Sequence, residues 1–324
     1  MRIVYATDLH GRESIYNGVL QRAKQEKAAA IINGGDMFPR EFQNEFIEGF
    51  LADHFDACHD AGIRYLCMPG NDDLAAWDTL FNDECQKHWA VNIFGQVVRL
   101  GDHEVIGFNF VRDYPFRLKD RCLRDYPNCP DCMQFGSGLV SRITRHGKEG
   151  ISNINWSEEI DRRPTMRKAL EMLPVPSDMS KAIYVIHDPP ASLGLDVCSD
   201  GKGVGSVSVR EFIEKNQPFL TLHGHIHESP DVSGKWNALV GRTTSVQPGQ
   251  GHCVVIDLDA LPLAMERSSI AEITRFYFDC PHCLQTIQTV SHGKIHSLKE
   301  CPHCAHEIND KDRVIMNAAI DKPE

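Results

Sequence analysis

The segment FLTLHGHIHES (residues 219–229) joins a short apolar run to a glycine and two histidines, His225 and His227. An apolar run of this length is typical of a buried strand that ends where the polar residues begin. Two histidines one residue apart have two explanations. They occur by chance in a chain with 16 histidines, or they are metal ligands at the end of a strand. The other strands of the chain decide between these explanations.

Four other expected strands also end in residues that can bind metal ions. RIVYAT (2–7) is followed by Asp8 and His10, AAIIN (29–33) by Gly-Gly-Asp36, IRYLCM (63–68) by Pro-Gly-Asn71-Asp72, and AIYVIH (182–187) ends in His187. Any one of these pieces taken alone is better explained as a turn or as a core histidine than as a ligand. Five pieces in order are not, because the carboxyl ends of strands form the binding edge of an α/β sheet. They predict one metal site.

Alternating strand and helix patterns predict a large α/β domain at residues 1–265. Helices are expected near 14–28, 41–61 and 206–216, strands at 239–246 and 252–259, and a hairpin between QVVRL and EVIGFNF. Residues 109–180 break the alternation and are expected to form an insertion or cap. From residue 270 the composition changes, and residues 270–324 are expected to form a small second domain.

The ordered pieces resemble the ligand set of the calcineurin-like metallophosphoesterase family: Asp-x-His, Gly-Asp, Gly-Asn-Asp, His and Gly-His-x-His, over residues 8–227. The resemblance implies a four-layer α/β/β/α sandwich and two metal ions that share Asp36. One ion would be held by Asp8, His10, Asp36 and His227, and the other by Asp36, Asn71, His187 and His225.

The later part of the domain resembles one subgroup of predicted phosphoesterases within that family. The resemblance rests on HDPP (187–190), on a Gly-Ser pair before a helix (205–206) and on QPG (247–249), in which Gln247 replaces an asparagine. It extends over about residues 1–260.

The ligand types favour particular metals and a particular reaction. Carboxylate, amide and imidazole groups suit Mn²⁺, Fe or Zn²⁺ better than Cu(I). Two such ions about 3.5–4 Å apart can hold a bridging hydroxide and stabilise charge on phosphoryl oxygens. We therefore expect a metal-dependent phosphohydrolase, a phosphodiesterase or phosphomonoesterase, acting on a nucleotide or a nucleic-acid end. The alternative is a weakly catalytic or non-catalytic metal-binding module that recruits a protein or nucleic-acid partner.

Asp72 departs from the family pattern, which has a histidine after Gly-Asn. That histidine is credited with protonating the leaving group or stabilising the transition state. An aspartate with an ordinary pKa near ~3.9 would be anionic and would repel a phosphate dianion. Either Asp72 is an acid of raised pKa, or its position has no catalytic role, or His223 replaces the missing histidine. The catalytic candidates are therefore Asn71, Asp72 and His223, and phosphodiesters or substrates with good leaving groups are expected to be favoured.

The tail contains the motif Cys-Pro-His-Cys twice, at Cys280–Cys283 and Cys301–Cys304. Two such pairs 17 residues apart fit a tetrahedral structural zinc site and resemble a zinc ribbon. We expect Cys280, Cys283, Cys301 and Cys304 to hold one Zn²⁺. Residues 276–324 carry 5 Lys/Arg and 7 Asp/Glu, which argues against a strong phosphate-binding surface. A stabilising or partner-docking role is at least as compatible with this composition.

Cysteines and basic residues also gather in the expected insertion. Cys129 and Cys132, with Cys122 and a fourth ligand such as His146, could form a second zinc site, although a single Cys-x₂-Cys pair is weak evidence. Residues 112–168 hold 12 Lys/Arg against 8 Asp/Glu. This excess either lines a substrate cleft or is a solvated surface, and the solvated surface is slightly favoured.

Length and charge exclude some classes of protein. The chain has 324 residues and a net charge of −11, so bulk charge would not attract nucleic acid. No apolar run approaches the roughly 18 residues of a membrane helix. The first strand begins at Arg2, which leaves no space for a signal peptide, and a cytoplasmic location is expected.

Overall fold

The computed structural model describes residues 1–129, 141–145, 148–270, 273–279 and 286–292. The chain divides into two compact units, Met1–Ser269 and Ile270–Glu324. The first unit carries all of the sequence-predicted phosphoesterase residues. Within the described ranges, every helix is too short or too polar to span a lipid bilayer.

The first sheet of the larger unit has six strands in the order β16–β15–β1–β2–β3–β4. They are β1 (Arg2–Ala6), β2 (Ala30–Asn33), β3 (Arg64–Cys67), β4 (Ala90–Asn92), β15 (His252–Asp257) and β16 (Ala264–Ser269). Strands β1 to β4 are parallel, whereas β15 runs antiparallel to β1. The carboxyl ends of β1, β2 and β3 therefore lie at one edge.

The second sheet has six strands in the order β13–β14–β12–β11–β6–β5. They are β5 (Val97–Leu100), β6 (His103–Phe108), β11 (Ala182–Ile186), β12 (Leu220–Leu222), β13 (Asn237–Val240) and β14 (Thr243–Val246). Strands β6, β11, β12 and β14 lie side by side in this sheet and are parallel to one another. The carboxyl ends of β11 and β12 thus lie at a common edge.

The two sheets pack face to face, because alternate residues of each strand enter one shared apolar core. Ile3 and Tyr5 of β1 belong to the same buried cluster as Ile183 and Val185 of β11. The intervening residues face the opposite way, as the period of two along a strand requires. Each sheet therefore has a second apolar face that helices must cover.

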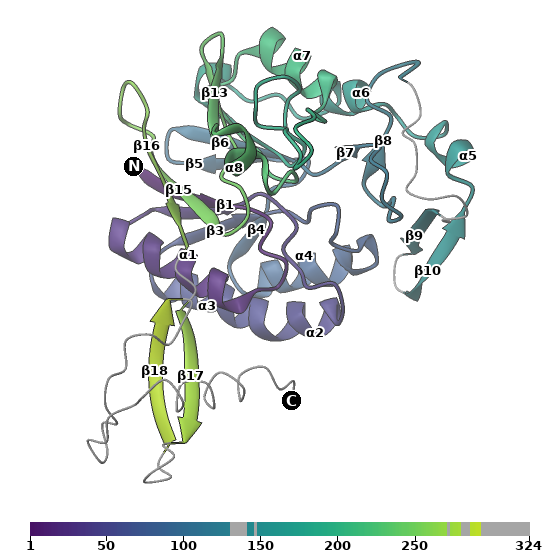
Figure 1. Ribbon diagram of the computed structural model, residues 1–324. Coiled ribbons are helices and arrows are strands. Elements are labelled where there is room, and N and C mark those ends of the chain that lie inside the picture. The colour runs from purple at the N-terminus through teal and green to yellow at the C-terminus, as the bar shows by residue number, and fades with distance from the viewer. Residues whose placement is uncertain (130–140, 146–147, 271–272, 280–285, 293–324) are drawn as a thin grey trace. The chain divides into compact units, whose positions relative to one another are not determined.

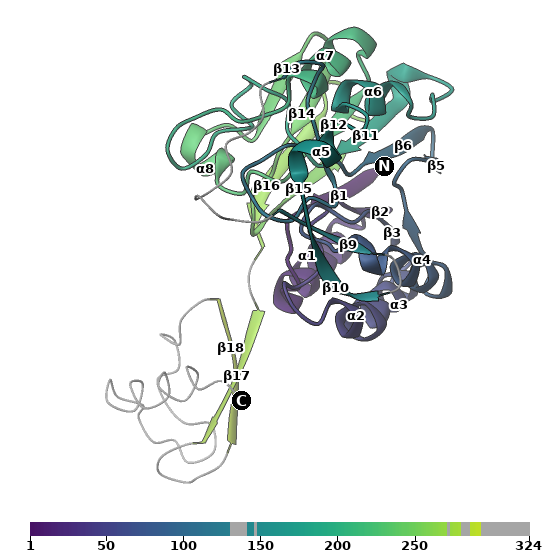
Figure 2. The same cartoon turned by 90° about the vertical axis from the view of Figure 1, so that its right-hand side faces the viewer.

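Helices cover both outer faces of this pair of sheets, as Figure 2 shows. Among the described residues, three helices lie on the first sheet. The first is α1 (Glu13–Glu26), and the second is one continuous helix made of α2 (Gln43–Phe46), η1 (Ile47–Leu51) and α3 (Ala52–Asp60). The third is α4 (Asp78–Lys87), which follows the short η2 (Ala75–Trp77). On the second sheet lie α6 (Met166–Glu171) and α7 (Val207–Asn216), whose Leu170 and Ile213 pack against Tyr184. The mixed α/β fold with two sheets that the sequence predicts is confirmed.

Residues 109–180 contribute to the outer layer as well as forming an excursion from it (Figure 1). The described elements here are the paired β7 (Val111–Arg112) and β8 (Cys122–Leu123), the hairpin β9 (Ser141–Arg145) and β10 (Lys148–Ile154), and α5 (Trp156–Ile160) and α6. Leu123 and Met166 enter the core cluster beneath α7. Part of this segment is therefore integral to the sandwich.

Two local expectations need correction. The helix expected at 41–61 contains a π-helical turn, η1, at Ile47–Leu51. The single strand expected at 239–246 is two antiparallel strands, β13 and β14, joined at Gly241 and Arg242. Gly241 has φ of 62°, a conformation that reverses the chain and that glycine adopts without strain. The remaining short elements are η3 (Met179–Lys181) and α8 (Ser229–Ser233).

The described residues of the second unit form one antiparallel hairpin of β17 (Ile273–Asp279) and β18 (Thr286–His292). Cys280, Cys283, Cys301 and Cys304 lie outside the described residues. The expected zinc ribbon therefore stays a prediction.

Candidate metal centre

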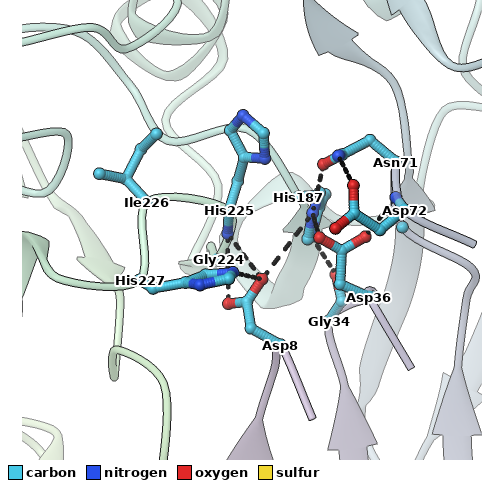
Figure 3. Close-up of polar contacts among 12 residues, drawn as sticks. Asp8, Gly34, Asp36, Asn71, Asp72, His187, Gly224, His225, Ile226 and His227 are labelled. Atoms are coloured by element: carbon cyan, nitrogen blue, oxygen red, sulfur yellow. Dashed lines mark hydrogen bonds and ion pairs between the residues drawn. The ribbon is translucent and has the colours of Figure 1, made fainter. Parts of the chain in front are cut away.

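Loops that follow five strands bring their polar residues to one place (Figure 3). Two groups of side chains offer ligand atoms that all lie within 4.8 Å of one another in each group. The first group is Asp8, His10, Asp36 and His227, and the second is Asp36, His187 and His225. Asn71 adjoins the second group, because its Oδ1 lies 3.0 Å from His187 Nε2. Asp36 is the residue common to both.

The backbone at this place is strained. Asp8, His10, Asp36 and His225 have positive φ values of 59°, 45°, 50° and 68°. A residue with a Cβ adopts this left-handed conformation at a cost of roughly 1–2 kcal/mol. The surrounding hydrogen bonds hold it in place: the amide of His10 donates to Asp36 O at 2.9 Å and that of Asp8 to Gly35 O at 2.9 Å. Strain at four neighbouring site residues indicates a functional constraint on their directions.

Two glycines allow the loops to approach the carboxylates closely. A Cβ on Gly224 would lie 2.7 Å from Asp8 Oδ2, and one on Gly70 would collide with the carboxylate and amide of Asp36. The sequence pattern Gly-Asn and Gly-His therefore has a steric cause at both positions.

His187 and Asp36 form a buried pair at the centre of the site. His187 Nδ1 lies 2.9 Å from the carbonyl oxygen of Gly34, which can only accept, so Nδ1 carries a proton. Its Nε2 is directed at Asp36 Oδ2, 3.3 Å away. Burial lowers the pKa of His187, but the charge of Asp36 outweighs burial and raises this pKa to about 10. Burial raises the pKa of Asp36, but the charge and hydrogen bond of His187 outweigh burial and hold this pKa well below its usual value.

His10, His225 and His227 complete the imidazole set. The Nε2 atoms of His10 and His227 lie 3.1 Å apart, and His227 Nε2 lies 3.4 Å from Asp8 Oδ1. Burial lowers the pKa of His225 to about 3, which keeps its ring in the neutral form that a metal ligand requires. Asp8 accepts from the amide of His225 at 3.0 Å.

This donor set fits divalent cations. Asp8 is fully buried and Asp36 is 1% exposed, and two buried carboxylates need a compensating positive charge. In the protein alone, a proton on His187 supplies part of that charge. Carboxylate, amide and imidazole donors that converge on two adjoining points are the chemistry of a two-ion site.

The loop that carries His225 and His227 is held by Gln247, which the sequence marked as a departure from its subgroup. Its Nε2 donates to the carbonyl oxygens of Gly224 at 3.1 Å and Ile226 at 2.7 Å. Ile226 is 6% exposed and packs in a cluster with Tyr114. The alternation of His, Ile and His therefore separates two ligands from one packing residue.

Asp72 lies at the mouth of the site, and its side chain is 44% exposed. The negative charge of Asp36, followed by burial, raises the pKa of Asp72 to about 7. Its Oδ1 accepts from Asn71 Nδ2 at 2.9 Å, and its amide donates to Asp36 Oδ1 at 2.8 Å. Bound cations would oppose the effect of Asp36 on this pKa.

Asp73, the next residue, has a structural position that the sequence did not reveal. Its carboxylate accepts from the amides of Met37, Phe38 and Gly70 at 2.9, 2.7 and 2.7 Å. Asp73 thereby fixes the loop after β2 to the loop after β3, and these loops carry Asp36 and Asn71.

The structure does not bring His223 to the other candidates. His223 is fully buried, and its Nδ1 lies 2.9 Å from Ile186 O and its Nε2 2.8 Å from Thr221 Oγ1. Both ring nitrogens thus have partners inside the fold. This position makes His223 a packing residue of the β11–β12 edge.

A cleft of about 600 Å³ opens beside the site, lined by Asp36, Asn71, Asp72, His225 and His227 among others. Tyr114 and Phe116, which the sequence did not single out, line the same cleft. The Tyr114 ring lies 4.4 Å from that of His225, and its hydroxyl donates to Asp188 Oδ1 at 2.7 Å. Tyr114, Pro115 and Phe116 belong to residues 109–180, so this segment supplies part of the cleft wall.

Of the expected second zinc site, Cys122 and Cys129 are described, and Cys132 and His146 are not. Cys122 is fully buried, and burial raises the pKa of its thiol to about 12. Its Sγ lies 3.7 Å from the carbonyl oxygen of Leu118. The expected second zinc site therefore stays a prediction, because two of its four candidate ligands lie outside the described residues.

Comparison with known proteins relates the chain to one family. Residues 1–229, which contain every candidate ligand of the site, match the family described as calcineurin-like phosphoesterase. The crystal structure of TT1561 of Thermus thermophilus is similar in fold, with a TM-score of 0.52, 17% identity, and coverage of 83% of this chain and 98% of that chain. The structure of a novel archaeal phosphodiesterase is more distant, with a TM-score of 0.40, 11% identity, and coverage of 83% and 99%. The sequence has no significant match among curated proteins.

Proposed function

The chain belongs to the calcineurin-like phosphoesterase family, and from that premise we propose that it hydrolyses phosphate esters with two divalent metal ions. The observation that carries the proposal is the position of Asp36, whose carboxylate belongs to both candidate ligand groups. A shared carboxylate is what a pair of ions about 3.5–4 Å apart requires.

Each ion would have its own ligands. Asp8, His10, Asp36 and His227 would hold one, and Asp36, Asn71, His187 and His225 the other. Mn²⁺, Fe or Zn²⁺ suit these donors. When bound, the two ions would supply a water molecule of lowered pKa and positive charge for the phosphoryl oxygens.

The residues around the site would orient the ligand atoms and shield part of the centre. The Nδ1–H of His187 donates to Gly34 O, which directs Nε2 into the site. The strained turns at Asp8 and Asp36 point both carboxylates inward, and Tyr114 covers the ring of His225.

Asp72 is proposed to act on the substrate side. At the cleft mouth it can donate a proton to the leaving oxygen in its acid form, and it repels the substrate in its anionic form. A phosphodiester carries less negative charge than a monoester, so we propose a phosphodiesterase that acts on nucleotide-like esters or on esters with good leaving groups. The tail cysteines Cys280, Cys283, Cys301 and Cys304 are proposed to hold one structural Zn²⁺ separately from this chemistry.

The test is hydrolysis of bis(p-nitrophenyl) phosphate by the full chain with added Mn²⁺, with Asp36→Asn as the paired variant. We expect turnover by the wild type and a loss of at least ~100-fold in Asp36→Asn, because several kcal/mol of charge stabilisation depend on the ions. Manganese content is measured on the same samples. Bound manganese without turnover in the wild type would reject hydrolysis and favour a non-catalytic metal-binding module.

A further inference from the structure

The cleft has an apolar wall for which the metal chemistry gives no role. We call Pro115, Phe116, Val204 and Ile226 the Phe116 wall, since all four line the cleft beside the candidate ligands. The ring of Phe116 lies 5.7 Å from the ring of His225. A group that touches the wall is therefore close enough to be attached to a phosphate held at the metal centre.

The wall is held rigidly from behind. Phe116 stacks on Tyr114 with ring centres 5.7 Å apart and planes 13° apart. Lys119, fully buried, donates to Asp113 Oδ1 at 2.8 Å and to the carbonyl oxygen of Tyr114 at 2.6 Å. Trp156 Nε1 also donates to Asp113 Oδ1, at 3.0 Å. A preformed apolar surface loses little entropy when a ligand covers it.

The charged residues known to line the cleft beyond the metal ligands are mostly acidic: Asp72, Asp200 and Glu228 against Lys202. The lysine, Lys202, is paired with Asp200 at 2.6 Å. The carboxylate of Glu228 accepts from the amide and the hydroxyl of Ser199, both at 3.0 Å. Asp72, Asp200 and Glu228 against Lys202 give the lining residues beyond the metal ligands two net negative charges when Asp72 is ionised.

We propose that the Phe116 wall is a specificity site for an uncharged aromatic group of the phosphate ester. The inference rests on the proposed function and names its substrate class: esters with one phosphate group and a flat apolar substituent. Esters with a further anionic group near that substituent are disfavoured by the net negative charge of the lining.

The test uses phosphonates, which bind as phosphate esters do but have a carbon–phosphorus bond that the enzyme does not hydrolyse. Calorimetry gives the Kd of phenylphosphonate, methylphosphonate and 4-carboxyphenylphosphonate for the Mn²⁺-loaded full chain. We expect phenylphosphonate to bind about tenfold more tightly than methylphosphonate, from the apolar area that the ring buries. The 4-carboxy derivative is expected to lose most of that advantage.

Variants locate the effect. Phe116→Ala is expected to bring the phenyl-to-methyl ratio close to one, and the milder Phe116→Leu to give an intermediate ratio. Phe94→Ala, at an exposed phenylalanine outside the cleft lining, is expected to leave the ratio unchanged. Equal binding of phenyl- and methylphosphonate by the wild type would overturn the proposed specificity role of the Phe116 wall and would leave the proposed function intact. Binding of neither phosphonate would also overturn the specificity role of the wall, and hydrolysis of bis(p-nitrophenyl) phosphate by the same sample decides separately whether the proposed function stands.

Discussion

The Nε2 atoms of His10 and His227 lie 3.1 Å apart, although 217 positions separate the two residues in the chain. Neither ring has another hydrogen-bond partner for its Nε2 among the described residues apart from Asp8, which faces His227. Two imidazole nitrogens that face each other can share only one proton. Their convergence on one point is the geometry that a cation between them would produce.

The two ligand groups should be separable by mutation. His227→Ala removes a ligand of the first group, and His225→Ala one of the second. We expect each variant to retain about one Mn²⁺ of two per chain at micromolar metal. Removing a residue that only orients a ligand lowers metal affinity ~10–100-fold, and removing the ligand itself should lower it further. Metal analysis of gel-filtered protein measures this. Full retention of manganese by either variant would contradict the ligand assignment.

Asp72→His restores the residue that the family pattern has at this position. We expect it to raise the ratio of monoesterase to diesterase activity at least ~10-fold, because an anionic neighbour is replaced by a proton donor. Matched p-nitrophenyl monoester and diester substrates measure the ratio. If the wild type already prefers the monoester strongly, the proposed role of Asp72 is wrong.

Asp73→Ala should destabilise the fold more than its position in a loop implies. The substitution leaves the buried amides of Met37, Phe38 and Gly70 without an acceptor. At about 1–3 kcal/mol for each unsatisfied group, we expect a loss of at least ~3 kcal/mol in urea unfolding. Asp102→Ala, at an exposed hairpin aspartate, is the control and should change stability by less than ~0.5 kcal/mol.

Lys119→Met breaks the buried ion pair behind the Phe116 wall. An unpaired Asp113 carboxylate should cost about 3–5 kcal/mol, whereas Lys119→Met combined with Asp113→Leu should recover much of this loss. Chemical unfolding of the two variants tests the coupling. A double variant no more stable than the single one would show that Lys119 acts through its aromatic neighbours Phe116 and Trp156.

His54 should make stability depend on pH in the acid range. Burial lowers its pKa from about 6.5 to about 4. The unfolded chain therefore takes up a proton between these values and the folded chain does not, so stability falls as pH drops from about 6.5 to about 4. The full contribution is about 3 kcal/mol.

His54→Phe isolates this contribution, since the ring packs against Tyr16, Phe50 and Tyr65. The free energy of unfolding of the variant should decline less than that of the wild type over this pH range. Parallel curves for the two proteins would contradict a buried neutral His54.

The strand ends were predictable because each is a local pattern. An apolar run followed by Asp, Asn or His needs no tertiary information, and β1, β2, β3, β11 and β12 end within a few residues of their expected positions. The turn at Gly241 was not recognised, because residues that favour strands, Val240 and Thr243, lie close on both sides of it. The hairpin exists because β14 pairs with β12 on its other side.

The roles of supporting residues could not be predicted from local patterns. Asp72 and Asp73 are adjacent and chemically identical, yet one faces the cleft and the other binds three backbone amides. His223 and His225 are separated by one glycine, yet one is locked in the core and the other faces the site. Which side of the chain a residue faces depends on turns with positive φ, and these turns are stabilised by distant partners.

The sequence by itself determined the kinds of ligand atom, their order along the chain and the sheet edge at which they stand. Only the tertiary structure decided that Asp73 binds two loops together, that both ring nitrogens of His223 have partners inside the fold, and that Tyr114 and Phe116 line the cleft. The physical reason is that the identity of a ligand atom depends on a single residue, whereas convergence depends on contacts between distant segments, such as those of His10 and His227, which are 217 residues apart. Such contacts form only when the two sheets pack on each other.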